Sequence, residues 1–197
     1  MLDLIPFTLF ATVASITPGP TNILILGHSL RHGLRGAMPL VIGACMSAAA
    51  IVWAVGAGIG DVLMAHASLQ IAMKWMGIAW LTYLAWQIFR SAPTLAPNGD
   101  EARLGFSTAA GLQLVNPKVW MMALAVVSVF ARPDADETQH VAILAAIFFC
   151  VSLPCLALWA VLGRSAARLL TSSRHIQRFN RGLAILLLVS AWAALLP

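Results

Sequence analysis

Apolar residues form six long runs in this chain, separated by short polar or basic connections. The runs cover about 4–29, 38–60, 68–89, 105–130, 139–162 and 180–196. Because an apolar stretch of about 20 residues crosses a bilayer as a helix, the pattern predicts six transmembrane helices. The sixth run is short and is expected to begin in the basic segment before it. We therefore expect a single transmembrane domain over residues 1–197.

The first and the fourth run are interrupted by proline at matching places, Thr17-Pro18 and Asn116-Pro117. Proline lacks an N–H and disfavours the α conformation of the preceding residue, so a helix tends to end there. Thr and Asn are helix-capping residues, and proline suits the first helical position. Each run is therefore expected to consist of two half-helices that meet near the middle of the membrane. Broken helices at corresponding positions of two halves indicate the binding site of a secondary transporter.

The two halves of the chain also align with each other. An offset of 99 residues places Phe7, Ala11, Ile16, Thr17 and Pro18 on Phe106, Ala110, Val115, Asn116 and Pro117. An offset of 105 residues places Ile71, Gly77, Ala79 and Leu81 on Ile176, Gly182, Ala184 and Leu186. This predicts repeat one over about 1–90, a cytoplasmic loop over 91–104 and repeat two over about 105–197. Since three spans per half is an odd number, the expected fold is an all-α membrane protein of two inverted three-helix repeats.

Charged residues are scarce, and their placement predicts an orientation. The chain is 60% hydrophobic and 10% charged, where a soluble domain carries about 25% charged residues. Nine arginines fall in three connections on one side of the predicted membrane, namely Arg31, Arg35, Arg90, Arg103, Arg164, Arg168, Arg174, Arg178 and Arg181. Arg132 lies on the other side, beside Asp134, Asp136 and Glu137.

By the positive-inside rule, the three basic connections are cytoplasmic and both termini lie outside. We interpret the net charge of +5 as a topology signal that contacts anionic lipid, with no role in nucleic-acid binding. The start, Met1-Leu2-Asp3, lacks the basic residues of a cleavable signal, so the first span is expected to be retained.

Residues at the two breaks are the candidate site. They are Thr17, Pro18, Gly19, Pro20, Thr21 and Asn22 at the first break and Asn116, Pro117 and Lys118 at the second. In an inverted repeat the half-helices after the two breaks run in opposite directions, and their N-termini face each other. Each N-terminus offers free N–H groups and about half a positive charge, which suits an anionic group such as a carboxylate. The alternative is a pair of ordinary proline kinks.

Several segments of the sequence resemble those of a known protein family. The resemblance rests on the segments TPGPTN at 17–22, GLRG at 33–36 and QLVNPK at 113–118, and on Lys74, Gly77 and Tyr83-Leu84. Together they are similar to the LysE/RhtB family of amino-acid exporters and cover nearly the whole chain in order. The resemblance implies a multi-pass protein of the bacterial inner membrane that exports amino acids or related metabolites in exchange with protons. Many members place Asn directly after PGP, whereas Thr21 intervenes here.

The ionisable residues inside the predicted spans are few, and they are the candidates for binding the substrate or carrying a proton. Lys118 is the strongest functional candidate, whereas Lys74 is expected to reach the outer surface, and His28 and His66 are expected to be solvated. No Asp or Glu falls in the middle of a predicted span, so the sequence does not identify a proton-carrying group. A stripe of small residues, Gly43, Ser47, Ala50 and Ala54, predicts close packing within the monomer, with a homo-oligomer interface as the alternative.

Two other functions stay open. An intramembrane enzyme needs a nucleophile with its base, a carboxylate pair or a metal cluster. A small-ion transporter or channel for a hard cation needs anionic oxygens in the bundle. The sequence offers neither pattern at mid-span and no cofactor motif. An exporter of amino acids is therefore the leading hypothesis, with the bilayer and a small amino acid as partners.

Overall fold

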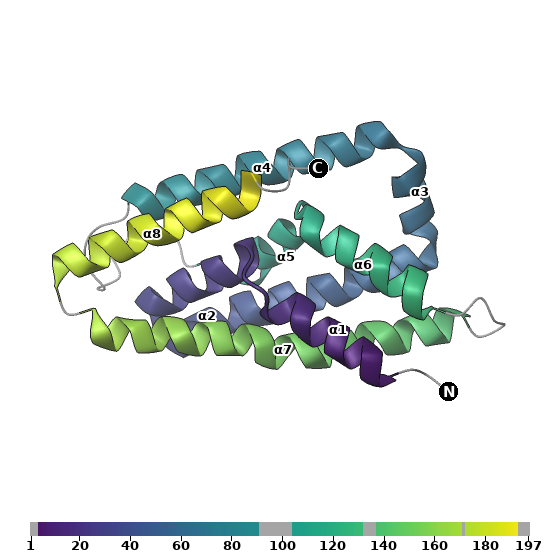
Figure 1. Cartoon of the computed structure of the whole chain (residues 1–197), viewed down its shortest axis with the longest axis horizontal. Coiled ribbons are helices and arrows are strands. Elements are labelled where there is room, and N and C mark those ends of the chain that lie inside the picture. The colour runs from purple at the N-terminus through teal and green to yellow at the C-terminus, as the bar shows by residue number, and fades with distance from the viewer. Residues whose placement is uncertain (1–3, 91–103, 132–136, 171, 193–197) are drawn as a thin grey trace.

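The computed structural model describes residues 4–90, 104–131, 137–170 and 172–192, and over these ranges the chain is helical with no strand (Figure 1). The elements are α1 Leu4–Ile16, α2 Pro20–Ala54, η1 Val55–Ile59, α3 Gly60–Ala65, α4 Ala67–Arg90, α5 Phe106–Leu114, α6 Pro117–Phe130, α7 Glu137–Leu169 and α8 Ser173–Trp192. The expectation of an all-α protein is confirmed. The expected loop up to residue 103, Arg132, Asp134, Asp136 and the chain ends 1–3 and 193–197 lie outside the described residues.

Helix α2 is two helical segments that meet at Gly33. Gly33 has φ 69° and ψ −179°, a conformation open to glycine because it has no Cβ. Asn22 and Cys45, on either side of this glycine, line one cavity. In a straight helix a rise of about 1.5 Å per residue would place them about 35 Å apart. The chain therefore turns back at Gly33, in the connection between the first two predicted spans, and the two parts of α2 lie beside each other in Figure 1.

By length and composition, two helical stretches of the described residues can cross a membrane: Pro20–Ala65, which includes the turn at Gly33, and Thr138–Leu169. The bent pair Phe106–Leu114 and Pro117–Phe130 adds a third span if it is counted as one. Six spans are therefore not established by length and composition alone. α1 has 13 residues and is short for a span, and α4 and α8 carry polar residues along with their apolar ones.

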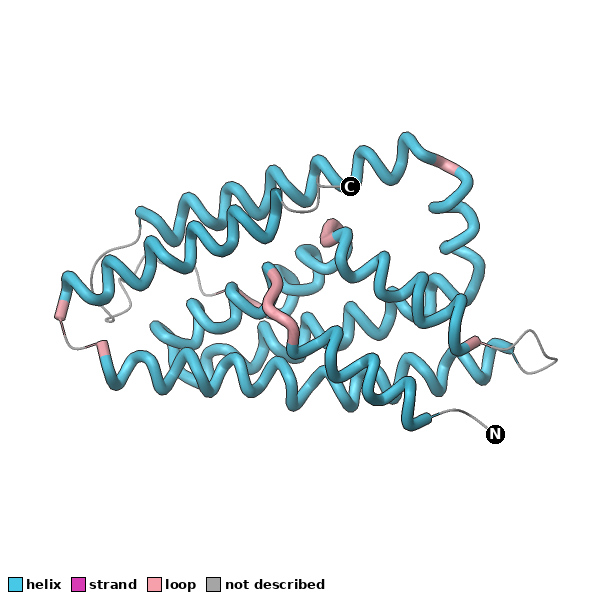
Figure 2. The backbone as a smooth tube through the Cα atoms, viewed as in Figure 1, coloured by secondary structure: helices cyan, strands magenta, loops and turns pink. Residues whose placement is uncertain are grey.

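The centre of the molecule is the contact between α2 and α7. The Ser29 hydroxyl of α2 donates to the Ala160 carbonyl of α7 at 2.6 Å. A Cβ on Gly163 would clash with the Leu26 carbonyl oxygen, so the two backbones meet where no side chain intervenes. Small residues permit this close approach between membrane helices. α5 packs on α2 and α1 packs on α7, whereas α4 and α8 pair along one side of the molecule (Figures 1 and 2).

His28 is buried, and the expectation that it is solvated is wrong. Its side chain is 6% exposed, and its ring stacks on that of His32 with centroids 4.2 Å apart. The reason is the hairpin at Gly33, which folds this segment into the bundle, where Trp80 of α4 lines the same cavity as both histidines. His66 is exposed, as expected.

Candidate substrate-binding site

The first break runs from the end of α1 at Ile16 to the start of α2 at Pro20. The Thr17 hydroxyl turns back and donates to the Val13 carbonyl, so it does not cap the next helix. Gly19 is the N-cap, with φ −161° and ψ 176°, and no described side chain bonds to the first turn of α2. The new helix therefore starts at Pro20 and not at Pro18, because Thr17 extends the preceding helix and Pro18 lies in the break.

Asn22 closes this break from within α2. Its side-chain Nδ2 donates to the carbonyl oxygens of Ser15 and Thr17, each at 3.0 Å. The indole Nε1 of Trp159 donates to the Ile16 carbonyl at 3.1 Å. These bonds occupy carbonyls that the helix end leaves without intrahelical partners. Asn22 thus holds the shape of the break, and its amide is bound to backbone.

The second break lies between α5, which ends at Leu114, and α6, which starts at Pro117, and it bends the path by 69°. Asn116 is the N-cap, and its Oδ1 accepts the backbone N–H of Lys118 at 3.2 Å. The predicted cap is confirmed here. The Trp120 indole donates to the Leu114 carbonyl at 2.8 Å. A tryptophan therefore bonds to a carbonyl at each break.

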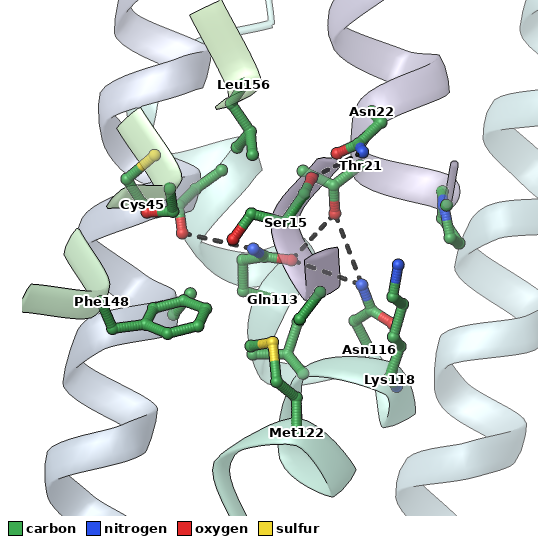
Figure 3. Close-up of a pocket in the computed structure, with 17 residues that line it drawn as sticks. Ser15, Thr21, Asn22, Cys45, Gln113, Asn116, Lys118, Met122, Phe148 and Leu156 are labelled. Carbon is green, nitrogen blue, oxygen red and sulfur yellow. Dashed lines mark hydrogen bonds between the residues drawn. The ribbon is translucent and has the colours of Figure 1, made fainter. Parts of the chain in front are cut away.

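A buried hydrogen-bond network joins the two breaks (Figure 3). The Thr21 hydroxyl donates to Gln113 Oε1 at 2.9 Å, and Gln113 Nε2 donates to the Ala44 carbonyl at 3.2 Å. Asn116 Nδ2 lies 3.4 Å from both Thr21 Oγ1 and Gln113 Oε1. Thr21, Gln113 and Asn116 are each less than a tenth exposed. The network fixes the relative position of the first turns of α2 and α6.

Lys118 reaches from the second break to the first. Its Nζ donates to the Thr17 carbonyl at 3.2 Å, and a Cβ on Gly19 would lie 3.1 Å from the same nitrogen. An ammonium group has three N–H donors, so this one bond leaves two for another acceptor. The positive charge of Lys118 therefore lies at the point where the two breaks meet.

Two hollows flank this point. A small cavity of about 50 Å³ lies on one side, and an open groove of about 1,110 Å³ lies on the other, between α6 and the α3–α4 segment. Gly19, Pro20, Asn116 and Lys118 line both. Of the other predicted residues, Thr21 and Asn22 line the cavity only, and Thr17, Pro18 and Pro117 line the groove only. The structure thus brings all nine predicted residues to one place.

The groove also holds two further charged residues, of which Lys74 was expected to reach the outer surface. Lys74 of α4 and Asp61 of α3 both line it, together with Lys118. Lys74 is half-buried and Asp61 is exposed. Within the described residues no group of three His, Cys, Asp or Glu side chains could hold a metal ion. The site can therefore bind by charge and hydrogen bonds, through side chains and helix ends.

Sequence reasoning missed the cavity's remaining polar residues, Ser15, Cys45, Gln113 and Ser152. Ser15 and Gln113 are polar residues in apolar helices just before the two breaks, and this position could have identified them as candidates for the site. Gln113 lies three residues before Asn116, almost one helical turn, so both side chains can share a face. Cys45 and Ser152 belong to α2 and α7 and carried no signal in the sequence, because only the fold brings them to the breaks.

Comparison with known proteins gives a family and several relatives. The model of the LysE type translocator family matches residues 12–196. A cysteine/O-acetylserine efflux protein of Salmonella choleraesuis is 30% identical over 190 residues, covering 94% of this chain and 93% of the relative. One of the same name from Escherichia coli O139:H28 is 27% identical over 186 residues, covering 94% and 93%. No solved structure matches the chain.

Proposed function

The chain belongs to the family of LysE-type translocators, and we propose that it is a secondary transporter that exports an amino acid or a close metabolite from the cytoplasm across the bacterial inner membrane. The observation that carries the proposal is the meeting of two helix breaks at one lysine, with a hollow on each side. The relatives are named for cysteine and O-acetylserine efflux, which makes these two compounds the first substrates to test.

The proposed architecture is six spans in two inverted repeats. It is supported by the order of elements, since α1, a break and the first part of α2 correspond to α5, a break and α6. The packing follows the same scheme, because α1 contacts α7 as α5 contacts α2, and the last helices of the halves, α4 and α8, contact each other. Inverted repeats with discontinuous helices at their interface are a common plan of secondary transporters.

Orientation follows from the arginines and can be measured directly. With both termini outside, reporter fusions after residues 35, 100 and 172 are expected to give cytoplasmic signals. Fusions after residues 65 and 135 serve as controls and are expected to report the outside. A periplasmic signal at any of the first three positions contradicts the orientation and reverses the direction of each half-helix.

We propose that the substrate's carboxylate binds at Lys118, on the groove side of the breaks. The first turn of α2 has no side-chain cap, so its positive end adds to the ammonium charge. The small cavity cannot hold a whole amino acid, because its 50 Å³ has space for only about three to five non-hydrogen atoms. The remainder of the molecule therefore lies in the groove.

Counterflow in proteoliposomes tests the function. The full chain is reconstituted, vesicles are loaded with one unlabelled amino acid, and entry of the same labelled compound is followed. A transporter concentrates the label transiently, a channel only equilibrates it, and an enzyme converts it. We expect counterflow with at least one of cysteine, O-acetylserine or serine. If no amino acid of a broad panel is exchanged, the proposal is contradicted.

Coupling to protons is tested in the same vesicles. An imposed pH gradient is expected to drive net movement of the substrate against its own gradient, and an uncoupler is expected to abolish this movement. Movement that ignores the pH gradient contradicts proton coupling and leaves export itself in place. The two results are independent because counterflow needs no proton gradient.

A further inference from the structure

The small cavity beside the breaks is lined by residues of five helices and has two kinds of wall (Figure 3). Polar side chains lie toward the breaks, including Ser15 of α1, Thr21 of α2 and Gln113 of α5. The opposite wall is apolar and includes Met122 of α6 and Phe148 of α7. This is the arrangement of a pocket for a short side chain, with polar groups that fix one end and apolar groups that exclude water.

The Ser15 hydroxyl is buried but has no hydrogen-bond partner among the described residues. Its side chain is 7% exposed, and its Oγ is buried without a hydrogen bond to any described residue. In Figure 3 this oxygen points toward the polar end of the cavity, near Gln113. A buried hydroxyl without a partner is destabilising, and such groups are rare unless a water or ligand satisfies them. The cavity's occupant is therefore expected to offer a group that can hydrogen-bond to Ser15.

A second hydroxyl also lines the cavity. Ser152 of α7 is 2% exposed and donates to the Phe149 carbonyl at 3.1 Å, so its oxygen still has lone pairs to accept with. Cys45 of α2 lines the same space. Lys118 is the one charged residue in the described lining, and the proposed carboxylate site already uses its charge. No Asp, Glu, Arg or His lines the cavity, so a charged side chain would have no further partner there. The lining favours an uncharged group that both donates and accepts weakly, such as a hydroxyl or a thiol.

Size restricts the occupant further. A volume of about 50 Å³ holds about three to five non-hydrogen atoms, counting about 10–15 Å³ for each water-sized group. A hydroxymethyl or thiomethyl side chain fits, whereas a phenyl ring or a lysine chain does not. Ala48, which is 4% exposed, forms part of the wall and leaves this space open because its side chain is one methyl group.

From these observations we propose that the cavity is the side-chain subsite of the transporter, and that it selects amino acids with a short, uncharged side chain ending in a hydroxyl or thiol. The inference rests on the proposed function, which places the substrate's carboxylate at Lys118. Gly19 and Lys118 line both hollows, so a substrate bound there reaches the cavity with its side chain while its charged groups stay in the groove. Ser15 and Ser152 are the specificity-determining residues.

The test compares substrates within one variant. Ser15→Ala and Ser152→Ala remove a hydroxyl each, and Ala48→Leu fills the cavity. Competition by serine, cysteine, alanine and glycine against counterflow is measured in proteoliposomes. We expect each serine variant to lose about three- to tenfold in apparent affinity for serine and cysteine while alanine and glycine change less than twofold. Ala48→Leu is expected to abolish competition by serine and cysteine and to spare glycine.

Controls separate folding from specificity. Ala142→Leu makes the same change at an exposed position of α7 and is expected to behave like the wild type. Ser15→Ala is a small change, so it keeps the test decisive if Ala48→Leu does not fold. Equal effects on all four amino acids, or no effect on any, overturn the subsite, since a cavity filled with water alone would give these results. Absence of counterflow in the wild type contradicts the proposed function instead.

Discussion

Lys118→Met is expected to weaken the apparent affinity of the transporter for its substrate about ten- to hundredfold. The reason is that a hydrogen bond to a charged partner contributes about 1.5–3 kcal/mol, and the ammonium is the cationic group at the meeting point of the breaks. Folding is expected to change little, because the Thr17 carbonyl keeps its hydrogen bond from Asn22 and belongs to an exposed residue that water can reach. Counterflow titrations on purified variants at matched protein amounts measure the effect.

Two further variants test whether the effect of Lys118→Met comes from the loss of its charge at this position. Lys118→Arg keeps the charge in a wider, planar group and is expected to retain part of the affinity. Lys74→Met removes a lysine that lines the same groove without the bond to Thr17, and it is expected to leave affinity within about threefold of wild type. If Lys118→Met and Lys118→Arg both transport with wild-type affinity, Lys118 only holds the helix break, and the carboxylate site lies elsewhere.

The sequence predicted the breaks because their signals are local. Proline acts on its own residue and on the one before it, so Pro117 with the Asn116 cap was predicted correctly. At the first break the same rule gave the right segment and the wrong first residue. Two prolines, Pro18 and Pro20, were both able to start a helix, and the bond of Thr17 to Val13 decided in favour of the second.

The partners of the polar residues could not be predicted, since they come from distant parts of the chain. Thr21 and Gln113 are 92 residues apart and hydrogen-bond directly, and Trp159 reaches Ile16 over 143 residues. In an apolar helix a single serine or glutamine has the same sequence signature whether it faces lipid, a neighbour or a cavity. His28 shows the same limit, because the hairpin at Gly33 decides its burial.

Gln113→Leu is the second change for which we expect a large effect, on stability and transport together. Gln113 is 4% exposed, and its side chain bonds to Thr21 of one half-helix and to the Ala44 carbonyl of the helix that follows. Leucine has a similar volume and no polar group, so these partners lose a bond in a place that water does not reach. Unsatisfied buried groups cost about 1–3 kcal/mol, which corresponds to a fall in melting temperature of about 5 °C.

Transport is expected to fall further than stability, because the network sets how the first turn of α2 faces Lys118 and Asn116. Thermal unfolding in detergent and counterflow in proteoliposomes measure the two effects on one preparation. Gln177→Leu, on the exposed side of α8, is the matched control and is expected to change neither. If Gln113→Leu lowers the melting temperature while transport stays at the wild-type rate, the network serves folding alone. The geometry of the two breaks would then tolerate its loss, and the substrate site would not depend on their alignment.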